Sequence, residues 1–219
     1  MREQPTITVL ILGGTGLVGS HLIQLALGHP RIKQVIAPSR RPLPIHERLH
    51  NPLIDFAALP SEAPWWEADA VLCALGTTRR QAGSQEQFRR VDHDYVIQTA
   101  ALARHCGAPV FVFNSSLGAD ANSRSLYLRT KGETEMDLEA LGFSALTHVR
   151  PSLLDGEKRT DSRPGERVGL WLAKRLEPLI PARYKAVRTR DVAITMLNAA
   201  LQPTQGVQVI ESDKIRRQS

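Results

Sequence analysis

Short, unbroken apolar runs alternate along the chain with longer stretches in which apolar residues recur every three or four positions. Unbroken runs of about four to eight residues are typical of strands buried on both faces of a parallel sheet. Apolar spacing of three and four is typical of a helix with one packed face. The pattern predicts strands at 9–12, 34–37, 53–56, 70–76, 109–116, 145–149 and 207–210.

Helices are predicted between these strands. The longest covers 85–106 and is ended by Gly107 and Pro109. Its packed face is expected to contain Val91, Tyr95, Ile97, Ala101 and Leu102. The other helices are predicted at 17–26, 126–141, within 162–176 and at 190–200, whereas 44–51 is predicted to be a polar connection. Alternation of this kind, with short loops and right-handed crossovers, predicts a doubly wound, mostly parallel α/β sheet with helices on both faces.

The composition is that of an ordinary globular protein, with 42% hydrophobic and 23% charged residues. At 219 residues, the chain is predicted to form a single domain, 1–219. No apolar run approaches the roughly 18 residues that a membrane span needs. Only five polar or turn-type residues separate Met1 from the first apolar stretch, which leaves no room for a signal peptide. We therefore expect a cytoplasmic protein without a membrane partner.

A formal net charge of +6 would suit a nucleic-acid-binding protein. However, the arginine doublets at 79–80, 89–90 and 216–217 are scattered among 22 acidic residues, with no interleaved aromatic surface. Solvated faces and one anionic cofactor site account for the charge, so we predict no nucleic-acid partner. Cys73 and Cys106 are too few and too far apart in sequence for a zinc site. They are expected as buried free thiols, and no metal is predicted.

Four glycines, Gly13, Gly14, Gly16 and Gly19, lie between the end of the first strand and the first turn of the first helix. They satisfy both G-x-G-x-x-G from Gly14 and G-x-x-G-x-x-G from Gly13, spacings that permit a tight turn and close approach of a pyrophosphate. The helix N-terminus adds free N–H groups and a positive dipole end. Glycines also serve plain turns, but the strand–loop–helix context predicts a dinucleotide site in a Rossmann-like domain. The predicted contacts are Gly13, Thr15, Gly16, Leu17 and Gly19.

The end of the second predicted strand indicates which dinucleotide binds. An acid there, roughly 20 residues past the glycines, would bind the ribose hydroxyls of NAD(H) and repel a 2′-phosphate. The chain has Ser39, Arg40 and Arg41 instead, and an arginine pair matches phosphate oxygens. We therefore predict NADPH/NADP as the cofactor, with a merely solvated arginine pair before Pro42 as the alternative. Asp55 is predicted either near the adenine or as the cap of a turn.

Two later strands end in residues suited to contact a ligand, because ligands of doubly wound sheets lie outside the carboxyl ends of the strands. Leu75 and Gly76 end the strand at 70–76, and Thr77 follows. A small residue there lets the cofactor pass, and a threonine can bond it. The strand at 109–116 delivers Ser115 and Ser116 to the same edge.

Tyr127 and Lys131 form a Tyr-x-x-x-Lys pair on the helix at 126–141. Four-residue spacing places both side chains on one face of a helix. An unperturbed phenol, with a pKa near 10, is a poor acid–base catalyst at neutral pH, but a neighbouring ammonium favours the phenolate. Lysine can also hold the nicotinamide ribose, and Ser115 or Ser116 would orient a carbonyl for hydride transfer. The same pair is common on solvated helices, but its position after a glycine loop and a serine-ended strand favours catalysis.

This ordered set resembles the short-chain dehydrogenase/reductase superfamily. Further blocks are similar to the atypical branch that contains the human Tat-interacting protein and its bacterial relatives. They are CALGTTR at 73–79, VDHDYV at 91–96, SSLGAD at 115–120, YLRTKGE at 127–133 and SRPGE at 162–166. The blocks extend through most of the chain.

The resemblance implies a Rossmann fold, NADPH at Gly13, Gly16, Gly19, Arg40, Arg41 and Gly76, and a Ser–Tyr–Lys site. It also implies a cofactor-side turn at Arg150 and Pro151. The implied activity is an NADPH-dependent oxidoreductase that reduces the carbonyl of an unidentified small molecule. Some members of this branch act as regulators, so an NADPH-binding regulatory or scaffold protein is the alternative. Asp92 departs from the superfamily, where an asparagine often completes a proton relay.

The last part of the chain, 151–219, is expected to supply a lid on the substrate side. Candidates for substrate contact are Arg163, Trp171 and Arg188. A core or rim position for the tryptophan and surface positions for the arginines are equally compatible with the pattern. The sequence indicates neither the substrate nor the oligomeric state.

Overall fold

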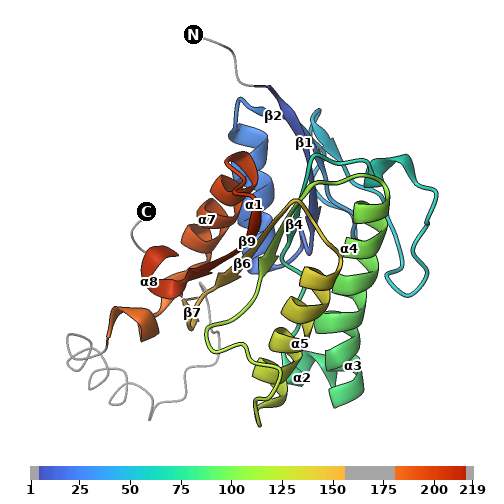
Figure 1. Cartoon of the computed structure of the whole chain (residues 1–219). Coiled ribbons are helices and arrows are strands. Elements are labelled where there is room, and N and C mark those ends of the chain that lie inside the picture. Colours follow the sequence, from blue (N-terminus) through green and yellow to red (C-terminus); the bar gives the residue numbers. More distant parts are fainter. Residues whose placement is uncertain (1–4, 156–180, 216–219) are drawn as a thin grey trace, which may run out of the picture.

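A seven-stranded parallel sheet forms the centre of the molecule (Figure 1). The computed structural model describes residues 5–155 and 181–215. The strands of the sheet are β1 (Ile7–Leu12), β2 (Ile32–Ile36), β3 (Leu49–His50), β4 (Ala70–Cys73), β5 (Val110–Asn114), β6 (Ala145–Arg150) and β9 (Gly206–Glu211). Their order is β3-β2-β1-β4-β5-β6-β9, and each neighbouring pair is parallel.

Helices cover both faces of this sheet. One layer contains α1 (Leu17–Gly28) and α7 (Thr189–Leu201), and the other contains α4 (Tyr95–His105) and α5 (Leu126–Ala140) (Figure 1). In β1, Val9 and Ile11 pack under the first layer and Leu10 and Leu12 under the second, all fully buried. Successive side chains of a strand point to opposite faces, so a strand covered on both must be apolar throughout. This explains the unbroken apolar runs and confirms the predicted doubly wound α/β fold.

The strand order reverses next to β1. The chain moves from β1 outward through β2 and β3, and then returns to place β4 on the other side of β1. The loops after β1 and β4 therefore diverge at the carboxyl edge, and such a switch point is where ligands of open α/β sheets bind. The loops after β5 and β6 end at the same edge.

The prediction of a strand at 53–56 is wrong. The outer strand is β3, inside the segment predicted to be a polar connection, and it pairs with β2 at Val35 and Ile36. Leu53 makes only an isolated bridge to Ser39. Of the apolar residues at 53–56, Phe56 enters the core while Leu53 stays 60% exposed. At a sheet edge the pairing of a strand depends on one neighbour alone, so hydrophobicity is a weak guide there.

The helix predicted at 85–106 contains a π-helical turn. It consists of α3 (Gln85–Arg89), the π-turn η2 (Arg90–Asp94) and α4, without a break between them. The extra residue in a π-turn rotates the residues that follow relative to a regular helix. The predicted packed face is right in part, since Tyr95, Ile97 and Leu102 are half-buried and pack against the core. The fully buried positions of α4 are Val96, Thr99, Ala100 and Ala103.

The remaining elements are short. They are η1 (Pro64–Trp66), α2 (Arg79–Ala82), β7 (Leu154–Asp155), η4 (Ala182–Tyr184), β8 (Val187–Arg188) and α8 (Ser212–Ile215). β7 and β8 form a separate two-stranded parallel sheet. The helix predicted within 162–176 lies outside the described residues. Within the described segments, no helix is long and apolar enough to cross a membrane.

Candidate cofactor and active site

The glycine loop after β1 is closely packed on its neighbours. Gly13 has φ +84, a left-handed conformation that favours glycine, and a Cβ there would lie 2.5 Å from the Ala74 carbonyl oxygen. A Cβ on Gly19 would overlap the Gly13 carbonyl, so helix α1 approaches the loop at this point. Gly14 instead faces the Ile23 side chain. Of the two possible glycine frames, the one that begins at Gly13 therefore shapes the loop.

The amino end of α1 is open. Gly16 is its N-cap and provides no side-chain hydrogen bond, and Thr15, Gly16 and Leu17 are exposed. The first N–H groups of a helix have no partner within the helix and carry its positive dipole end. A Cβ on Gly16 would meet only the Gly13 carbonyl oxygen, at 3.3 Å. This glycine cradle with uncapped N–H groups fits a pyrophosphate.

Ser39 holds the turn after β2. It is 4% exposed, and its hydroxyl donates to the Arg41 carbonyl oxygen at 2.6 Å while accepting from Asn51 Nδ2 at 2.8 Å. Asn51 also accepts from the Leu43 N–H. Arg40 and Arg41 are exposed and form no ion pair with any residue that the structure describes.

Asn51 connects the two sides of this turn through its contacts with Ser39 and Leu43. The sequence did not predict this role, because no local pattern distinguishes Asn51 from the other polar residues of the segment 44–51. Asp55, predicted near the adenine or as a turn cap, accepts the Ala57 N–H at 2.9 Å. That bond is the one expected of a turn cap.

The loop after β4 meets η2 and α5. The Thr77 N–H donates to Asp92 Oδ2 at 2.7 Å. A Cβ on Gly76 would lie 3.2 Å from Asp92 Oδ1 and 3.9 Å from Lys131 Nζ. The Leu75–Thr77 segment therefore lies directly against the Asp92 carboxylate, and glycine at position 76 permits this close approach.

Lys131 is deeply buried, at 3% exposure, whereas Tyr127 one turn earlier is 37% exposed. Lys131 Nζ lies 3.1 Å from Asp92 Oδ1 and 4.8 Å from the centroid of the Phe113 ring. Burial alone would lower the pKa of Lys131, but the Asp92 carboxylate outweighs this and, with a smaller contribution from Tyr127, raises it. The lysine is therefore an ammonium at neutral pH. Sequence reasoning singled out Asp92 as a departure but did not predict this ion pair.

The two serines after β5 differ in accessibility. Ser115 is 3% exposed, and its Oγ is buried without a hydrogen-bond partner among the described residues. Ser116 is half-buried, and its hydroxyl makes only a long, 3.4 Å contact with the Leu117 carbonyl oxygen. Of the two serines, Ser116 is the more accessible to solvent.

Arg150 and Pro151 make contacts that hold the walls of the site. Arg150 binds Glu135 on α5 through Nε at 2.9 Å and Nη2 at 2.5 Å. The Pro151 carbonyl oxygen accepts the Leu117 N–H at 2.8 Å. A cofactor contact for these two residues stays a prediction. Arg188, the N-cap of α7, is exposed, while Arg163 and Trp171 lie outside the described residues.

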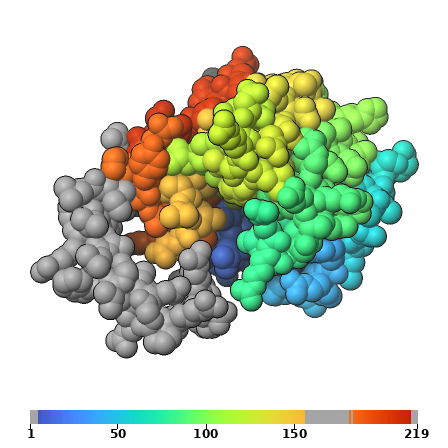
Figure 2. Space-filling view, turned by 90° about the horizontal axis from the view of Figure 1, so that it is seen from below, coloured from blue at the N-terminus to red at the C-terminus, as the bar shows by residue number. Residues whose placement is uncertain are grey.

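The carboxyl edge of the sheet is seen in Figure 2. The dark blue surface of the N-terminal segment is visible there between gold residues near 150 and green residues of α2 and α3. Because β1, β4, β5 and β6 are parallel neighbours, the loops that carry the glycines, Gly76, the serines and Arg150 all begin at this edge of the sheet.

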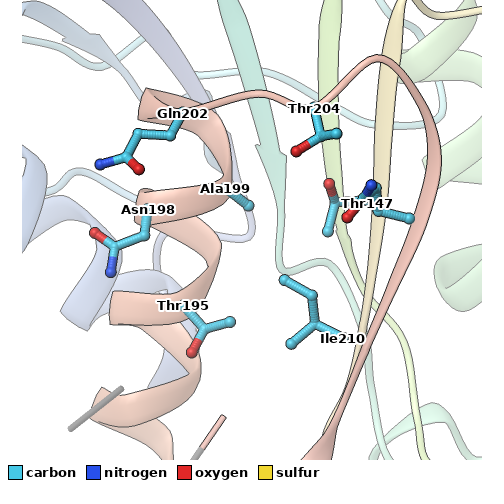
Figure 3. A pocket seen from close by; sticks show the side chains of 8 residues that line it. Thr147, Thr195, Asn198, Ala199, Gln202, Thr204 and Ile210 are labelled. Carbon is cyan, nitrogen blue, oxygen red and sulfur yellow. The ribbon is translucent and has the colours of Figure 1, made fainter. Parts of the chain in front are cut away.

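A pocket of about 170 Å³ lies elsewhere, between α7 and the strands β6 and β9 (Figure 3). Its polar lining consists of Thr147, Thr195, Asn198, Gln202, Thr204 and Gln208. These side chains are uncharged, and none belongs to the predicted site. Within residues 5–155 and 181–215, no group of three or more His, Cys, Asp or Glu side chains is arranged to hold a metal ion.

Known proteins match most of the chain. A model of the NAD dependent epimerase/dehydratase family matches residues 9–176. Protein HTATIP2 from Rattus norvegicus is 38% identical over 217 residues, covering 95% of this chain and 87% of that protein. Protein FMP52, mitochondrial, from Candida albicans is 35% identical over 189 residues, covering 78% of this chain and 82% of that protein.

Solved structures share the fold at lower identity. MoeE5 in complex with UDP-glucose and NAD has a TM-score of 0.69 at 19% identity, covering 92% of this chain and 74% of that chain. The Bordetella bronchiseptica enzyme WbmG in complex with NAD has a TM-score of 0.66 at 15% identity, covering 96% of this chain and 74% of that chain. At this level of identity, the likeness extends to the fold alone.

Proposed function

The chain belongs to the NAD dependent epimerase/dehydratase family, and on that premise we propose that it is an NADPH-dependent oxidoreductase that reduces the carbonyl of a small molecule. One observation carries the proposal. Lys131 is buried as an ammonium beside Gly76, and Tyr127 is exposed one turn earlier on the same helix. A fixed cation inside and an accessible phenol outside suit a site in which one residue holds the cofactor and the other exchanges a proton.

Each part of the cofactor has a matching feature. The loop of Gly13, Gly16 and Gly19, with the open end of α1, suits the pyrophosphate. Arg40 and Arg41 are exposed after β2, the strand that pairs with β1, and suit the 2′-phosphate of NADPH. The structural relatives MoeE5 and WbmG bind NAD, so the choice of NADPH depends on this arginine pair.

The reaction needs a proton as well as a hydride. When bound, the nicotinamide supplies the hydride to the carbonyl carbon. The Tyr127 hydroxyl donates its proton to the carbonyl oxygen, and its 37% exposure allows water to return that proton. Lys131 holds the ribose, and the Ser116 hydroxyl hydrogen-bonds the carbonyl oxygen and orients it. We choose Ser116 because the Ser115 hydroxyl is buried.

A second function is supported by the charges at the site. The Lys131 ammonium is paired with the Asp92 carboxylate. An ammonium whose charge is balanced by a carboxylate stabilises the Tyr127 phenolate less than an unpaired ammonium would. This favours an NADPH-binding regulatory or scaffold protein with little turnover as the alternative.

Binding and turnover are measured separately to distinguish the two functions. NADPH binding is followed by the change in its fluorescence, and oxidation is followed with a panel of aldehydes, ketones and nucleotide sugars. Tyr127→Phe is compared with Tyr95→Phe, which removes a hydroxyl from a residue packed against Phe56. We expect Tyr127→Phe to retain NADPH binding and lose turnover, while Tyr95→Phe retains both. NADPH binding without Tyr127-dependent oxidation on any substrate would favour the scaffold.

A further inference from the structure

The π-turn η2 brings Asp92 into the interior of the site. Asp92 is 1% exposed. Its Oδ1 atom lies 3.1 Å from Lys131 Nζ, and its Oδ2 atom accepts the Thr77 N–H at 2.7 Å. One carboxylate therefore joins the helix that carries Tyr127 to the loop that follows β4. π-turns are rare and occur frequently at functional sites.

Helix α5 holds this turn at three positions on one face. Lys131 pairs with Asp92, Thr134 Oγ1 lies 3.2 Å from the Asp92 carbonyl oxygen, and Asp137 lies 2.8 Å from His93 Nε2. Residues three apart share a helix face. The position of Asp92 is thus determined by packing on α5.

The groups around Lys131 leave Asp92 as its charge partner. Cys73 on β4 is buried, which raises the pKa of its thiol to about 12 and keeps it neutral. Phe113 on β5 presents its ring, and Tyr127 lies one turn earlier on α5. Removing an ammonium from water costs free energy, and the Asp92 carboxylate offsets that cost for Lys131. An uncharged residue at position 92 would leave the cost of burying the charge unbalanced.

We propose that Asp92 is a positioning residue whose carboxylate keeps Lys131 charged and directed at the loop after β4. This inference depends on the proposed function only for what Lys131 binds, namely the ribose next to the nicotinamide. Because the pair has no net charge, Lys131 does not serve as a phosphate-binding cation. The anionic groups of the cofactor are left to α1 and the arginine pair.

Thermal unfolding of the cofactor-free protein between pH 5 and pH 9.5 tests the pairing, with Asp92→Asn, Lys131→Met and the double variant. In Asp92→Asn the buried lysine loses its compensation, so its folded-state pKa falls below the unfolded value. Between these two pKa values the unfolded state binds more protons than the folded state, so stability rises with pH. In Lys131→Met the folded-state pKa of Asp92 rises above the unfolded value, and stability falls as pH increases.

The double variant lacks both groups and provides the baseline. Relative to it, we expect slopes of opposite sign in the two single variants, each of roughly 3 °C per pH unit. We also expect the double variant to melt above both single variants, because neither charge is left alone. If Asp92→Asn does not fold while the double variant does, that rescue also supports the pair. Equal slopes in all three variants, or equal loss of stability, would overturn it.

NADPH binding tests the positioning role. In Asp92→Asn we expect affinity to fall by about fivefold between pH 7 and pH 9.5, beyond any change in the wild type, because a neutral amine makes weaker hydrogen bonds. Wild-type affinity in Asp92→Asn at both pH values would reject positioning. The melting curves contain no cofactor, so they decide the pairing even if the wild type fails to bind NADPH, a result that would reject the proposed function alone.

Discussion

Gly19 in the first turn of α1 packs directly against the carbonyl oxygen of Gly13, so that a Cβ at position 19 would overlap that oxygen. The contact sets how closely the helix approaches the loop. We expect Gly19→Ala to lower the free energy of unfolding by about 2 kcal/mol, because overpacking displaces backbone at both ends of the contact. NADPH affinity should fall with it. Urea unfolding and fluorescence titration measure the two effects.

Gly28, at the other end of α1, provides the control. A Cβ there would meet nothing within 4 Å. We expect Gly28→Ala to be neutral or to stabilise by about 0.5 kcal/mol, because alanine restricts the unfolded chain. Equal losses in the two variants would contradict the close contact as the cause.

Reversing the charge of Arg40 and Arg41 should change the choice of cofactor. We expect Arg40→Glu/Arg41→Glu to lower NADPH affinity relative to NADH by about 100-fold, the loss of two charge-assisted hydrogen bonds to phosphate. Lys33→Glu/Lys214→Glu makes the same change in net charge at exposed residues elsewhere. It should leave the ratio unchanged. An unchanged ratio in the arginine variant would refute the proposed 2′-phosphate site.

The two adjacent serines should respond differently to removal of the hydroxyl. Ser116→Ala should lower kcat by about 100-fold, the effect of losing one donor to a reacting oxygen. Ser115→Ala should leave turnover intact and leave stability unchanged or slightly raised, because its Oγ has no partner within the described segments. Single-turnover kinetics on any carbonyl compound that is reduced, together with urea unfolding, measure this. A reversed order would assign the role to Ser115.

The buried Glu135 carboxylate is paired with the Arg150 guanidinium. Glu135 is 4% exposed and accepts two hydrogen bonds from the Arg150 guanidinium. Arg150→Met should therefore lower the free energy of unfolding by about 3 kcal/mol, the effect of leaving a buried charge unpaired. Glu135→Met/Arg150→Met should recover much of this loss, because neither charge is left unpaired. Loss of NADPH affinity in the folded double variant would show that Arg150 contacts the cofactor.

Cys73 should resist thiol reagents while the protein is folded. Burial raises the pKa of its thiol to about 12, so the reactive thiolate is absent at pH 8. Cys106 is only partly buried. With iodoacetamide at pH 8, we expect mass spectrometry to find Cys106 alkylated first and Cys73 alkylated only in denaturant. Equal rates in the folded protein would show that β4 opens.

Local features of the sequence determined most of the architecture. The unbroken apolar runs that became β1, β4 and β5 are recognisable because both faces of each strand are covered. The glycine spacing predicted a dinucleotide loop, and the four-residue spacing placed Tyr127 and Lys131 on one helix face. These inferences need only the local geometry of a strand, a turn or a helix, and that geometry is the same in every protein.

Tertiary structure alone decided the details of the site. Asp92 pairs with Lys131, Asn51 holds Ser39, and Arg150 binds Glu135 through contacts between separate elements. No local pattern distinguishes those polar residues from solvated ones. The π-turn that directs Asp92 inward depends on packing against α5, and the accessible serine is set by what covers its neighbour. Which polar groups meet is decided by the packing of distant segments, because a buried charge or hydroxyl is stable only where another element supplies its partner.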